Sequence, residues 1–289
     1  MRLERPFVRL PLRFDVARLQ EELASIADDL WMAHPQDYAG NSALPLVSTD
    51  GGRNDAFDAP MLPTVHLAAL PYMRQVLARF GTVVGRARLM RLAPEAGVPP
   101  HFDIQYYWRS RVRVHVPVLT DPQVLFRCED EAVHMAAGEA WIFDNWRMHE
   151  VVNPVARVRV HLVFDTTGTA EFWRLVREGS GGAAPVPVPF IADATPPLLT
   201  EQGPALPMLT PGEIDAELAF IAREVARAPG NDPAAAARLS AALEAFRHDW
   251  RAIWALKGPD RHGQLLALDL IRQLREAVAG PVAALRLVS

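Results

Sequence analysis

The stretch 82–168 constrains the fold most, because it consists of short β-rich segments in close succession. These segments read "TVVGRARLMRLA", "RVRVHVPVLT", "QVLFRCE", "AVHMAAGEAWIFD", "HEVVN" and "RVRVHLVFDTTG", and Pro, Gly and Asp residues separate them. Alternating apolar and polar residues favour strands, and many short strands at close spacing are typical of a sandwich or barrel. The sequence therefore predicts a mainly β core.

Helical patterns flank this core. Apolar residues recur at helical spacing over Asp15–Trp31, and "HLAALPYMRQVLARFG" predicts a second helix that Gly81 ends. After the β-rich stretch, the segment from Glu178 to Pro211 is dense in Pro and Gly, which predicts a linker or an extended strap with little regular structure. Beyond it, "TPGE" has the pattern of a helical capping box, and helical patterns follow. We expect a β-rich domain with N-terminal helices (1–177), a linker or strap (178–211) and a helical domain (212–289).

Charge and cysteine content exclude several kinds of protein. The net charge of −4 gives no electrostatic case for a nucleic-acid partner or an anionic membrane surface. The single cysteine, Cys128, excludes an intramolecular disulfide framework, and we expect it to be a small buried apolar residue. Charges and prolines interrupt the N-terminal stretch, unlike a signal peptide, and no apolar run approaches the roughly 18 residues of a membrane span. We therefore expect a cytoplasmic protein with no membrane or nucleic-acid partner.

Two segments carry residues that suit a metal ion. In "PPHFDIQYYW", His101 and Asp103 are two apart in extended chain, so both side chains leave the same face. In "GEAWIFDNWRMHEVVN", a turn around Asp144–Asn145 leads to His149 at the start of a strand. Two histidines and one carboxylate can occupy one face of an Fe(II) ion and leave positions for a bidentate co-substrate and O₂. Each segment alone also fits surface or core histidines.

An arginine ten residues after His149 adds a second kind of chemistry. If the chain folds back at Asn153-Pro154, Arg159 returns on the strand next to the one that carries His149. A buried guanidinium requires a planar anion, and a carboxylate is its natural partner. 2-Oxoglutarate fits this arrangement, because its keto-acid end can chelate the metal while its far carboxylate reaches Arg159.

The segment from about Gly40 to Asp165 resembles the aspartyl/asparaginyl β-hydroxylase family of Fe(II)/2-oxoglutarate oxygenases, and its layout is similar to that of bacterial L-proline cis-hydroxylases. The motifs that carry the resemblance are "LPLVSTDGG", "LPYMRQVL", "RARLMRLAPEAGVPPHFD", "RVRVHVPV", "AAGEAWIFDNWRMHEVVN" and "RVRVHLVFD", in the order and spacing of the family. The proline hydroxylases of this group also have about this length and a helical C-terminal domain.

The resemblance implies a fold and a set of roles. The fold is a double-stranded β-helix, jelly-roll or cupin-like, with flanking helices and a small C-terminal all-α domain. The metal ligands would be His101, Asp103 and His149, and Arg159 would bind the co-substrate, 2-oxoglutarate. An Arg-x-His motif at this place contacts a carboxylate in the family, which adds Arg113 and His115. The family member that acts on protein domains lacks the carboxylate ligand, whereas this chain keeps it at Asp103.

Other residues are weaker candidates for substrate contacts. They lie near the metal motifs, at the start of the first Arg-x-Arg-x-His copy or in the polar loop "NSALPLVSTDGGRND", and they are Arg111, Ser48, Thr49, Asp50, Tyr107 and Trp146. The alternative interpretations are a position at the rim or in solvent for Arg111, capping of the barrel for Tyr107 and surface packing for Trp146. In the second copy we expect Arg157 to be solvated or in a salt bridge, while His161 shares the face of Arg159.

We therefore expect a hydroxylase that acts on a free, proline-like amino acid or on an Asp, Asn or Pro residue of a peptide, with release of succinate and CO₂. One alternative is hydroxylation of a lipid acyl chain on the same core. Another is a non-catalytic, cupin-like barrel that binds a small ligand. The C-terminal helices could serve as a homodimer contact or as a lid. The sequence determines neither the substrate nor the carbon that is hydroxylated.

Overall fold

The computed structural model describes residues 3–33, 39–56, 59–101, 103, 106–203, 208–280 and 285. The chain divides into two units, Met1–Ala205 and Leu206–Ser289. The first unit contains the strands β1 (Phe7–Phe14), β2 (Met32–Ala33), β3 (Asn41–Thr49), β4 (Met61–Pro63), β5 (Ala87–Leu92), β6 (Gly97–His101), β7 (Val112–Leu119), β8 (Leu125–Cys128), β9 (Glu131–Val133), β10 (Glu139–Phe143), β11 (His149–Val152), β12 (Arg159–Thr166) and β13 (Val186–Val188). Its helices are α1 (Val16–Ala24), α2 (Val65–Ala68), α3 (Pro71–Arg79) and α4 (Ala170–Ser180), with short 3₁₀ turns at Asp28–Leu30 and Tyr106–Arg109.

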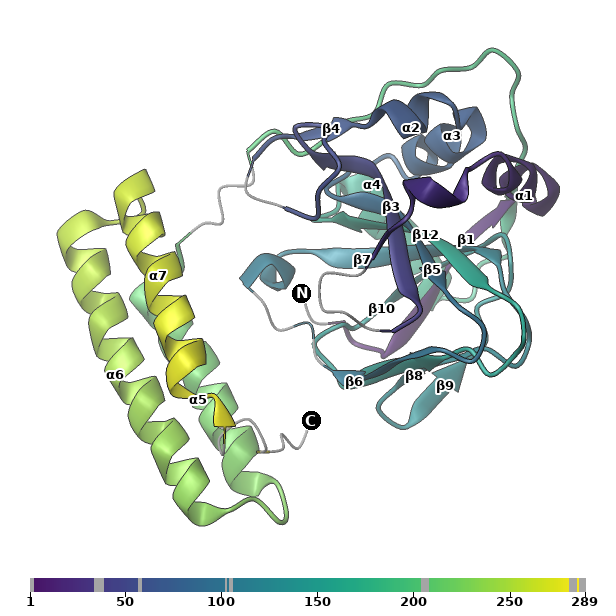
Figure 1. The fold of residues 1–289 in the computed structure, drawn as a ribbon. Coiled ribbons are helices and arrows are strands. Elements are labelled where there is room, and N and C mark those ends of the chain that lie inside the picture. The colour runs from purple at the N-terminus through teal and green to yellow at the C-terminus, as the bar shows by residue number, and fades with distance from the viewer. Residues whose placement is uncertain are drawn as a thin grey trace. The chain divides into compact units, whose positions relative to one another are not determined.

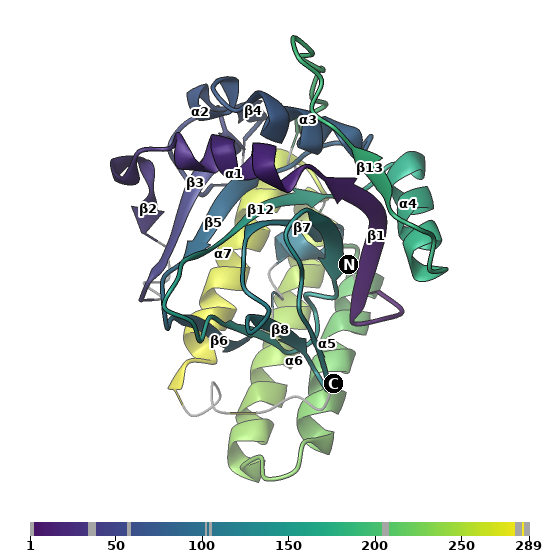
Figure 2. The same ribbon diagram turned by 90° about the vertical axis from the view of Figure 1, so that its right-hand side faces the viewer.

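The strands form two sheets. The larger has the order β13-β1-β10-β7-β12-β5-β3-β2, with β4 paired to β3, and the smaller has the order β6-β11-β8-β9. From β5 to β12 the chain passes back and forth between them, since β5, β7, β10 and β12 lie in the larger sheet and β6, β8, β9 and β11 in the smaller. Figures 1 and 2 show β6 and β8 lying below β5, β7 and β12. The predicted class, a mainly β core of the double-stranded β-helix type with flanking helices, is confirmed.

The central strands β7 and β12 of the larger sheet are buried on both faces, so neither has a solvated side. The outer face carries Val112, Val114 and Val116 of β7, which belong to the main apolar core together with residues of α3 and α4. The inner face carries polar residues and Phe143, which belongs to a smaller apolar cluster together with Phe126 and Val151 of the smaller sheet. The two faces of the Arg-x-Arg-x-His strings therefore meet different interiors, an apolar core outside and a polar site inside.

Two helix predictions are wrong in extent. The helix expected over Asp15–Trp31 ends at Ala24, and a 3₁₀ turn covers Asp28–Leu30. The helix expected from His66 to Gly81 is two helices, α2 and α3, and Pro71 is the first residue of the second. Proline has no backbone N–H for the i→i−4 bond and clashes with the preceding turn, so it starts a helix more readily than it continues one.

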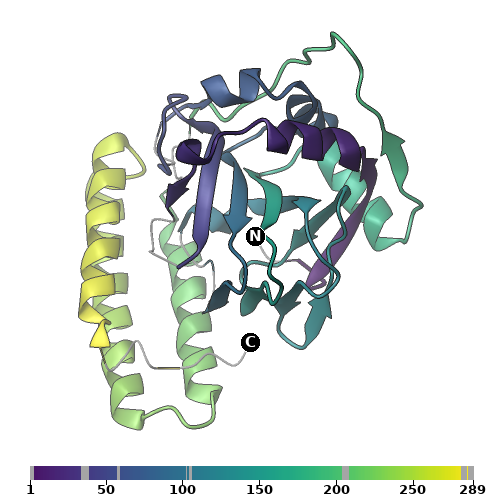
Figure 3. The same cartoon turned by 45° about the vertical axis from the view of Figure 1, so that its right-hand side comes forward.

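The Pro- and Gly-dense segment has more regular structure than predicted. Helix α4 continues to Ser180, and Val186–Val188 form β13, which pairs in parallel with β1. After β13 the chain passes over α2 and α3, as Figures 1 and 3 show in green. Side-chain amide hydrogen bonds from Gln75 to the carbonyls of Ile191 and Ala194 hold it there, at 2.8 and 2.9 Å. The residues that follow α4 thus pack as a strap on the first unit.

The second unit contains three helices among its described residues, α5 (Pro211–Arg227), α6 (Pro233–Lys257) and α7 (Arg261–Ala277). The predicted capping box is present, because the Thr210 hydroxyl accepts from the Glu213 N–H and the Glu213 carboxylate accepts from the Thr210 N–H. The Trp250 indole is buried and donates to the Leu209 carbonyl at 2.8 Å. In the part of the chain that the structure describes, no helix has the length and apolar character that crossing a membrane requires.

Candidate metal and co-substrate site

The three predicted metal ligands lie together. His101 ends β6 and His149 begins β11, and the two residues are opposite one another where these strands pair. Asp103 follows two residues after His101, and its N–H donates to the Asn145 carbonyl at 2.9 Å. One ligand atom from each of the three residues lies within 4.8 Å of the others. Strand pairing therefore brings two distant segments of the sequence to one point at the edge of the smaller sheet.

Backbone carbonyls orient both imidazoles for metal binding. The Nδ1 atom of His101 lies 2.8 Å from the Pro99 carbonyl, and that of His149 lies 2.9 Å from the Arg147 carbonyl. A carbonyl can only accept, so each Nδ1 carries the proton and each Nε2 presents its lone pair. Burial lowers the pKa of His149 to about 4, so this ring is neutral at pH 7. These residues fit an Fe(II) ion, which takes imidazole nitrogens and a carboxylate oxygen.

Asp103 is held in its ionised form. Burial opposes its ionisation, but Arg113 and the two neighbouring histidines outweigh this effect and lower the pKa of the carboxyl. The Arg113 Nη1 atom is 3.2 Å from Asp103, and its Nε atom is 3.2 Å from Asp165. The guanidinium also lies 4.2 Å from the centre of the Trp108 ring. Arg113 is thus fixed between two carboxylates and an aromatic ring, next to a candidate ligand.

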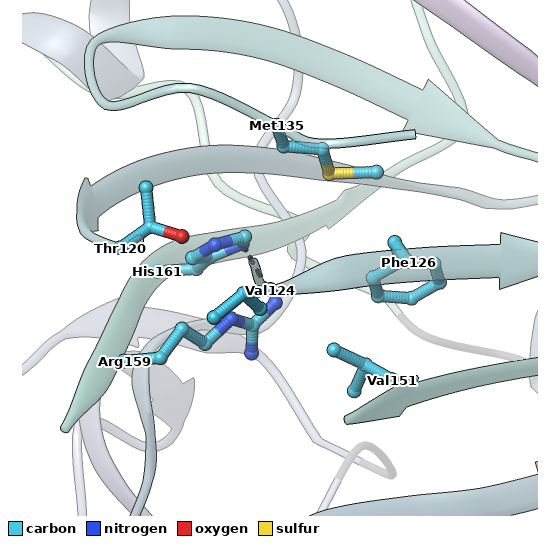
Figure 4. A pocket seen from close by; sticks show the side chains of 7 residues that line it. All are labelled: Thr120, Val124, Phe126, Met135, Val151, Arg159 and His161. Carbon is cyan, nitrogen blue, oxygen red and sulfur yellow. Dashed lines mark hydrogen bonds between the residues drawn. The ribbon is translucent and has the colours of Figure 1, made fainter. Parts of the chain in front are cut away.

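Arg159 lies in a small pocket with mostly apolar walls. Figure 4 shows Arg159 and His161 together on one strand, facing a wall that consists of Val124, Phe126, Met135 and Val151, with Thr120 at the edge. Among the residues that the structure describes, no carboxylate forms an ion pair with Arg159, and its buried Nε has no partner. Burial alone lowers the pKa of this guanidinium to about 9. A buried cation without an acid is costly, so the pocket is suited to an anionic ligand.

The histidines beside Arg159 are neutral and their protons can be assigned. Arg159 Nη2 is 2.8 Å from His161 Nδ1, and because a guanidinium can only donate, this Nδ1 accepts and the proton of His161 is on Nε2. His115 Nδ1 lies 3.3 Å from the same atom and must donate to it. Burial, followed by the nearby Arg159, lowers the pKa of both rings. The pocket thus offers two unpartnered donors, Arg159 Nε–H and His161 Nε2–H.

One geometric prediction is wrong. Arg159 does not lie on a strand next to the one that carries His149, because β11 belongs to the smaller sheet and β12 to the larger. The turn between them takes the chain across to the opposite sheet. The buried Asn153 secures this crossing, since its amide donates to the carbonyls of Ala93 and Arg157 at 2.8 and 2.7 Å. Arg159 still faces the interior that the two sheets share, because its strand contributes the inner face of the larger sheet.

The weaker candidates have structural partners. Arg111 is buried and forms an ion pair with Glu201 of the strap, and it donates to the Tyr107 carbonyl at 3.1 Å. The Trp146 indole donates to the Trp108 carbonyl at 3.1 Å. As expected, Arg157 is exposed and pairs with Asp121, and Cys128 is fully buried in the inner apolar cluster. Substrate contacts by Arg111, Tyr107 and Trp146 remain predictions.

The loop after β3 contributes a different residue from those predicted. The buried Ser48 hydroxyl donates to the Gly52 carbonyl at 2.5 Å, and Asp50 has a φ of 54°, so both build the turn. Thr49 is buried, with an unpartnered hydroxyl. The charged side chain that this loop delivers is Asp55, which pairs with Arg86 and Arg88. A role of Ser48, Thr49 and Asp50 in substrate binding remains a prediction.

Sequence reasoning missed the charged residues that adjoin Arg113. Arg86, Arg88 and Asp165 are all buried; Asp165 accepts a hydrogen bond from Arg113 and forms an ion pair with Arg86 at 3.5 Å. The signal that could have found them is "RARLMRL", in which Arg86 and Arg88 alternate with apolar residues just as in the two Arg-x-Arg-x-His strings. Period-two spacing places both arginines on the inner face of the larger sheet.

Comparisons with known proteins agree with this site. Residues 56–168 match the family model of aspartyl/asparaginyl β-hydroxylase. The chain is similar to L-proline cis-4-hydroxylase of Rhizobium meliloti (strain 1021), with 27% identity over 167 residues, 55% of this chain and 60% of the relative. It is also similar to L-proline cis-3-hydroxylase 1 of a Streptomyces species, with 27% identity over 162 residues, 49% of this chain and 53% of the relative. The matches therefore span just over half of each relative's length.

Among solved structures, the chain is similar to an oxidoreductase of the 2OG-Fe(II) oxygenase family from Burkholderia pseudomallei. It has 16% identity and a TM-score of 0.43 over 57% of this chain and 87% of that one. The family that the sequence motifs predicted is confirmed by the family model, whose residues 56–168 include the three clustered ligands and Arg159. Over these residues the β core of this chain is similar to the aspartyl/asparaginyl β-hydroxylase family.

Proposed function

We propose that the chain is an Fe(II)/2-oxoglutarate-dependent dioxygenase that hydroxylates a free, proline-like amino acid or an Asp, Asn or Pro residue in a peptide. The observation that carries this proposal is the combination of two sites in one interior. The cluster of His101, Asp103 and His149 suits Fe(II). The pocket at Arg159 suits the far carboxylate of a keto acid bound to that metal.

The chain's residues would divide the work as follows. The Nε2 atoms of His101 and His149 and the carboxylate of Asp103 would hold the metal, which supplies oxidative decarboxylation of the keto acid to succinate and CO₂ coupled to hydroxylation. Arg159 and His161 would bind the far carboxylate and so set the orientation of the co-substrate. Arg113 would keep Asp103 ionised and in place.

The surroundings of Arg159 support binding of a ligand with a charged end and an apolar stem. Phe126, Val124 and Val151 line the pocket with apolar surface, and a charge-assisted hydrogen bond is stronger in such surroundings than in water. The only described side chain that hydrogen-bonds the guanidinium is His161, so a carboxylate would not have to displace another acid. This is the main physical argument for a dicarboxylate co-substrate.

The direct test is co-substrate turnover with a panel of candidate substrates. Purified protein with Fe(II), O₂ and 2-oxoglutarate should release succinate, and one or more amino acids or peptides should stimulate the release and gain the mass of one oxygen atom. If L-proline stimulates succinate release and is itself hydroxylated, the substrate is a free amino acid. Stimulation by peptides alone would support the peptide alternative. No succinate from a fully metallated sample with any candidate would reject the proposal.

A further inference from the structure

A chain of alternating charges runs from the loop after β3 to the candidate metal site. Asp55 pairs with Arg88 and, at 3.1 Å, with Arg86. Arg86 lies 3.5 Å from Asp165, and Asp165 lies 3.2 Å from Arg113. Arg113 lies 3.2 Å from Asp103, a candidate metal ligand. Three arginines and three aspartates therefore form one connected network.

Exposure along this network is uneven. The side chains of Arg86, Arg88 and Asp165 are only 6%, 5% and 1% exposed, whereas that of Asp55 is 31% exposed. Asp55 is thus the most exposed member of the network, since Arg113 and Asp103 at its other end are 12% and 17% exposed. A charged small molecule that enters from solvent can reach the Asp55 carboxylate before it reaches the arginines behind it.

The charges of this network point to the kind of ligand. Its three guanidiniums balance three carboxylates only if Asp103 is counted among them. When Asp103 serves as a metal ligand, the remaining five residues carry an excess of one positive charge. Burial, with a contribution from the neighbouring Arg86, lowers the pKa of the Arg88 guanidinium to about 10, so Arg88 is itself under-stabilised. An additional carboxylate near Arg88 would offset both effects.

The attachment of Asp55 allows its carboxylate to change partner. The Asp55 backbone carbonyl accepts from Arg86 Nη1 at 2.8 Å, independently of the side chain. The loop therefore stays anchored when the carboxylate turns to another cation. A zwitterion can separate the Asp55–Arg88 pair charge for charge, with its carboxylate on Arg88 and its ammonium on Asp55. An anion or a cation alone would leave one of the two charges unpaired, which is costly for a buried group such as Arg88.

We propose that Asp55 and Arg88 form the recognition site for a free, zwitterionic α-amino acid. This inference rests on the proposed function and narrows its substrate to the unblocked amino acid. An internal residue of a peptide has neither the α-ammonium nor the α-carboxylate, and a terminal residue has only one of them, so neither can replace both partners of the ion pair. Asp55 selects for the amine, and Arg88 selects for the acid.

The experiment compares three related compounds with matched variants. The compounds are L-proline, N-acetyl-L-proline, which lacks the cationic amine, and L-prolinamide, which lacks the carboxylate. The test variants are Asp55→Asn and Arg88→Gln. The controls are Asp28→Asn and Arg91→Gln, because Arg91 lies on the same strand as Arg88 and pairs with the exposed Asp28 at 2.7 Å. One readout is succinate release, and the other is equilibrium dialysis of radiolabelled L-proline with protein loaded with Mn(II) and 2-oxoglutarate.

Wild-type protein should prefer L-proline to both analogues. Asp55→Asn should weaken L-proline binding and kcat/KM by about 10- to 100-fold and should largely remove the preference over N-acetyl-L-proline. Arg88→Gln should do the same for the preference over L-prolinamide. The affinity for 2-oxoglutarate, measured by calorimetry, should be unchanged, and the control variants should behave as wild type.

Several results would overturn this inference. It fails if Asp55→Asn retains the wild-type preference, or if Arg91→Gln loses the preference equally. If Arg88→Gln does not fold, the partly exposed Asp55→Asn variant decides alone. If peptides stimulate succinate release and L-proline stimulates it less or not at all, this inference is rejected and the dioxygenase proposal stays intact. Absence of succinate release with every compound would reject the proposed function, and this inference with it.

Discussion

Replacing Arg159 with methionine should stabilise the protein and at the same time abolish its response to 2-oxoglutarate. Arg159 is 5% exposed, and among the described residues no acid pairs with it. Methionine fills a similar volume, suits the apolar walls of the pocket and carries no charge. Most substitutions of buried residues destabilise a protein, so a gain in stability here would identify a charge that is kept for binding.

The size of the effect follows from the desolvation of the guanidinium. Burial lowers the pKa of Arg159 from its ordinary value to about 9, which corresponds to about 5 kcal/mol at most. Replacement of buried ionic groups by apolar ones stabilises proteins by roughly 1–4 kcal/mol. The loss of the hydrogen bond to His161 offsets about 1 kcal/mol of this. This leaves a net gain of up to about 3 kcal/mol, so in a protein of this size we expect the Tm to rise by up to roughly 12 °C.

The assay is thermal unfolding by calorimetry, with and without 2-oxoglutarate, on metal-loaded and oxygen-free samples. At a hundredfold excess over its Kd, the co-substrate should stabilise the wild type by about 2.7 kcal/mol and the variant hardly at all. Arg157→Met is the matched control, because Arg157 is 75% exposed at the same end of β12 and pairs with Asp121. The control should leave both quantities nearly unchanged. A less stable Arg159→Met variant that still responds to 2-oxoglutarate would refute the reasoning.

Three further predictions concern the metal, the pH and the fold. Asp103→Ala should weaken Fe(II) binding by at least about 100-fold in a competition titration, with no loss of secondary structure by circular dichroism, because it removes a ligand carboxylate. Burial lowers the folded-state pKa of His115 and His161 far below the ordinary 6.5, so the unfolded chain binds more protons below that pH. Stability should therefore fall by up to about 1.4 kcal/mol per histidine for each pH unit below 6.5, and urea midpoints that stay constant between pH 7 and 5 would contradict this. Gly138→Ala should cost roughly 2–3 kcal/mol in urea unfolding, since φ is +78° and the new Cβ would lie 2.6 Å from the Phe14 carbonyl oxygen.

The metal site could be predicted from the sequence because its geometry is local. His101 and Asp103 share a face by the period of a strand, and His149 begins a strand after a recognisable turn. The sequence predicted that Arg159 faces the same interior as the metal ligands. It also predicted, wrongly, that the strand of Arg159 pairs with the strand of His149. A turn of a few residues can close a hairpin or cross to a facing sheet, and the sequence pattern is the same in both cases. Whether the turn closes a hairpin or crosses to the facing sheet depends on which sheet has an open edge, and this is a property of the whole fold.

The network around Asp55 could not be predicted because it joins residues that are distant along the chain. Asp55 and Arg88 lie on a loop and a strand, and the inner face of that strand is also occupied by apolar residues. Nothing local distinguishes a loop aspartate that reaches a buried arginine from one that is solvated. In contrast, the break between α2 and α3 could have been predicted, because a proline at position 71 cannot donate to the turn before it.

The central claim is that one interior holds both Fe(II) and 2-oxoglutarate, and its most direct test is spectroscopic. Oxygen-free protein with Fe(II) should develop a weak visible metal-to-ligand charge-transfer band when 2-oxoglutarate is added. The account predicts this band in the wild type and its loss in Asp103→Ala. In Arg159→Met the band should require a far higher concentration of 2-oxoglutarate. A fully metallated wild-type sample without the band, or an Arg159→Met variant with the wild-type titration curve, would contradict the account.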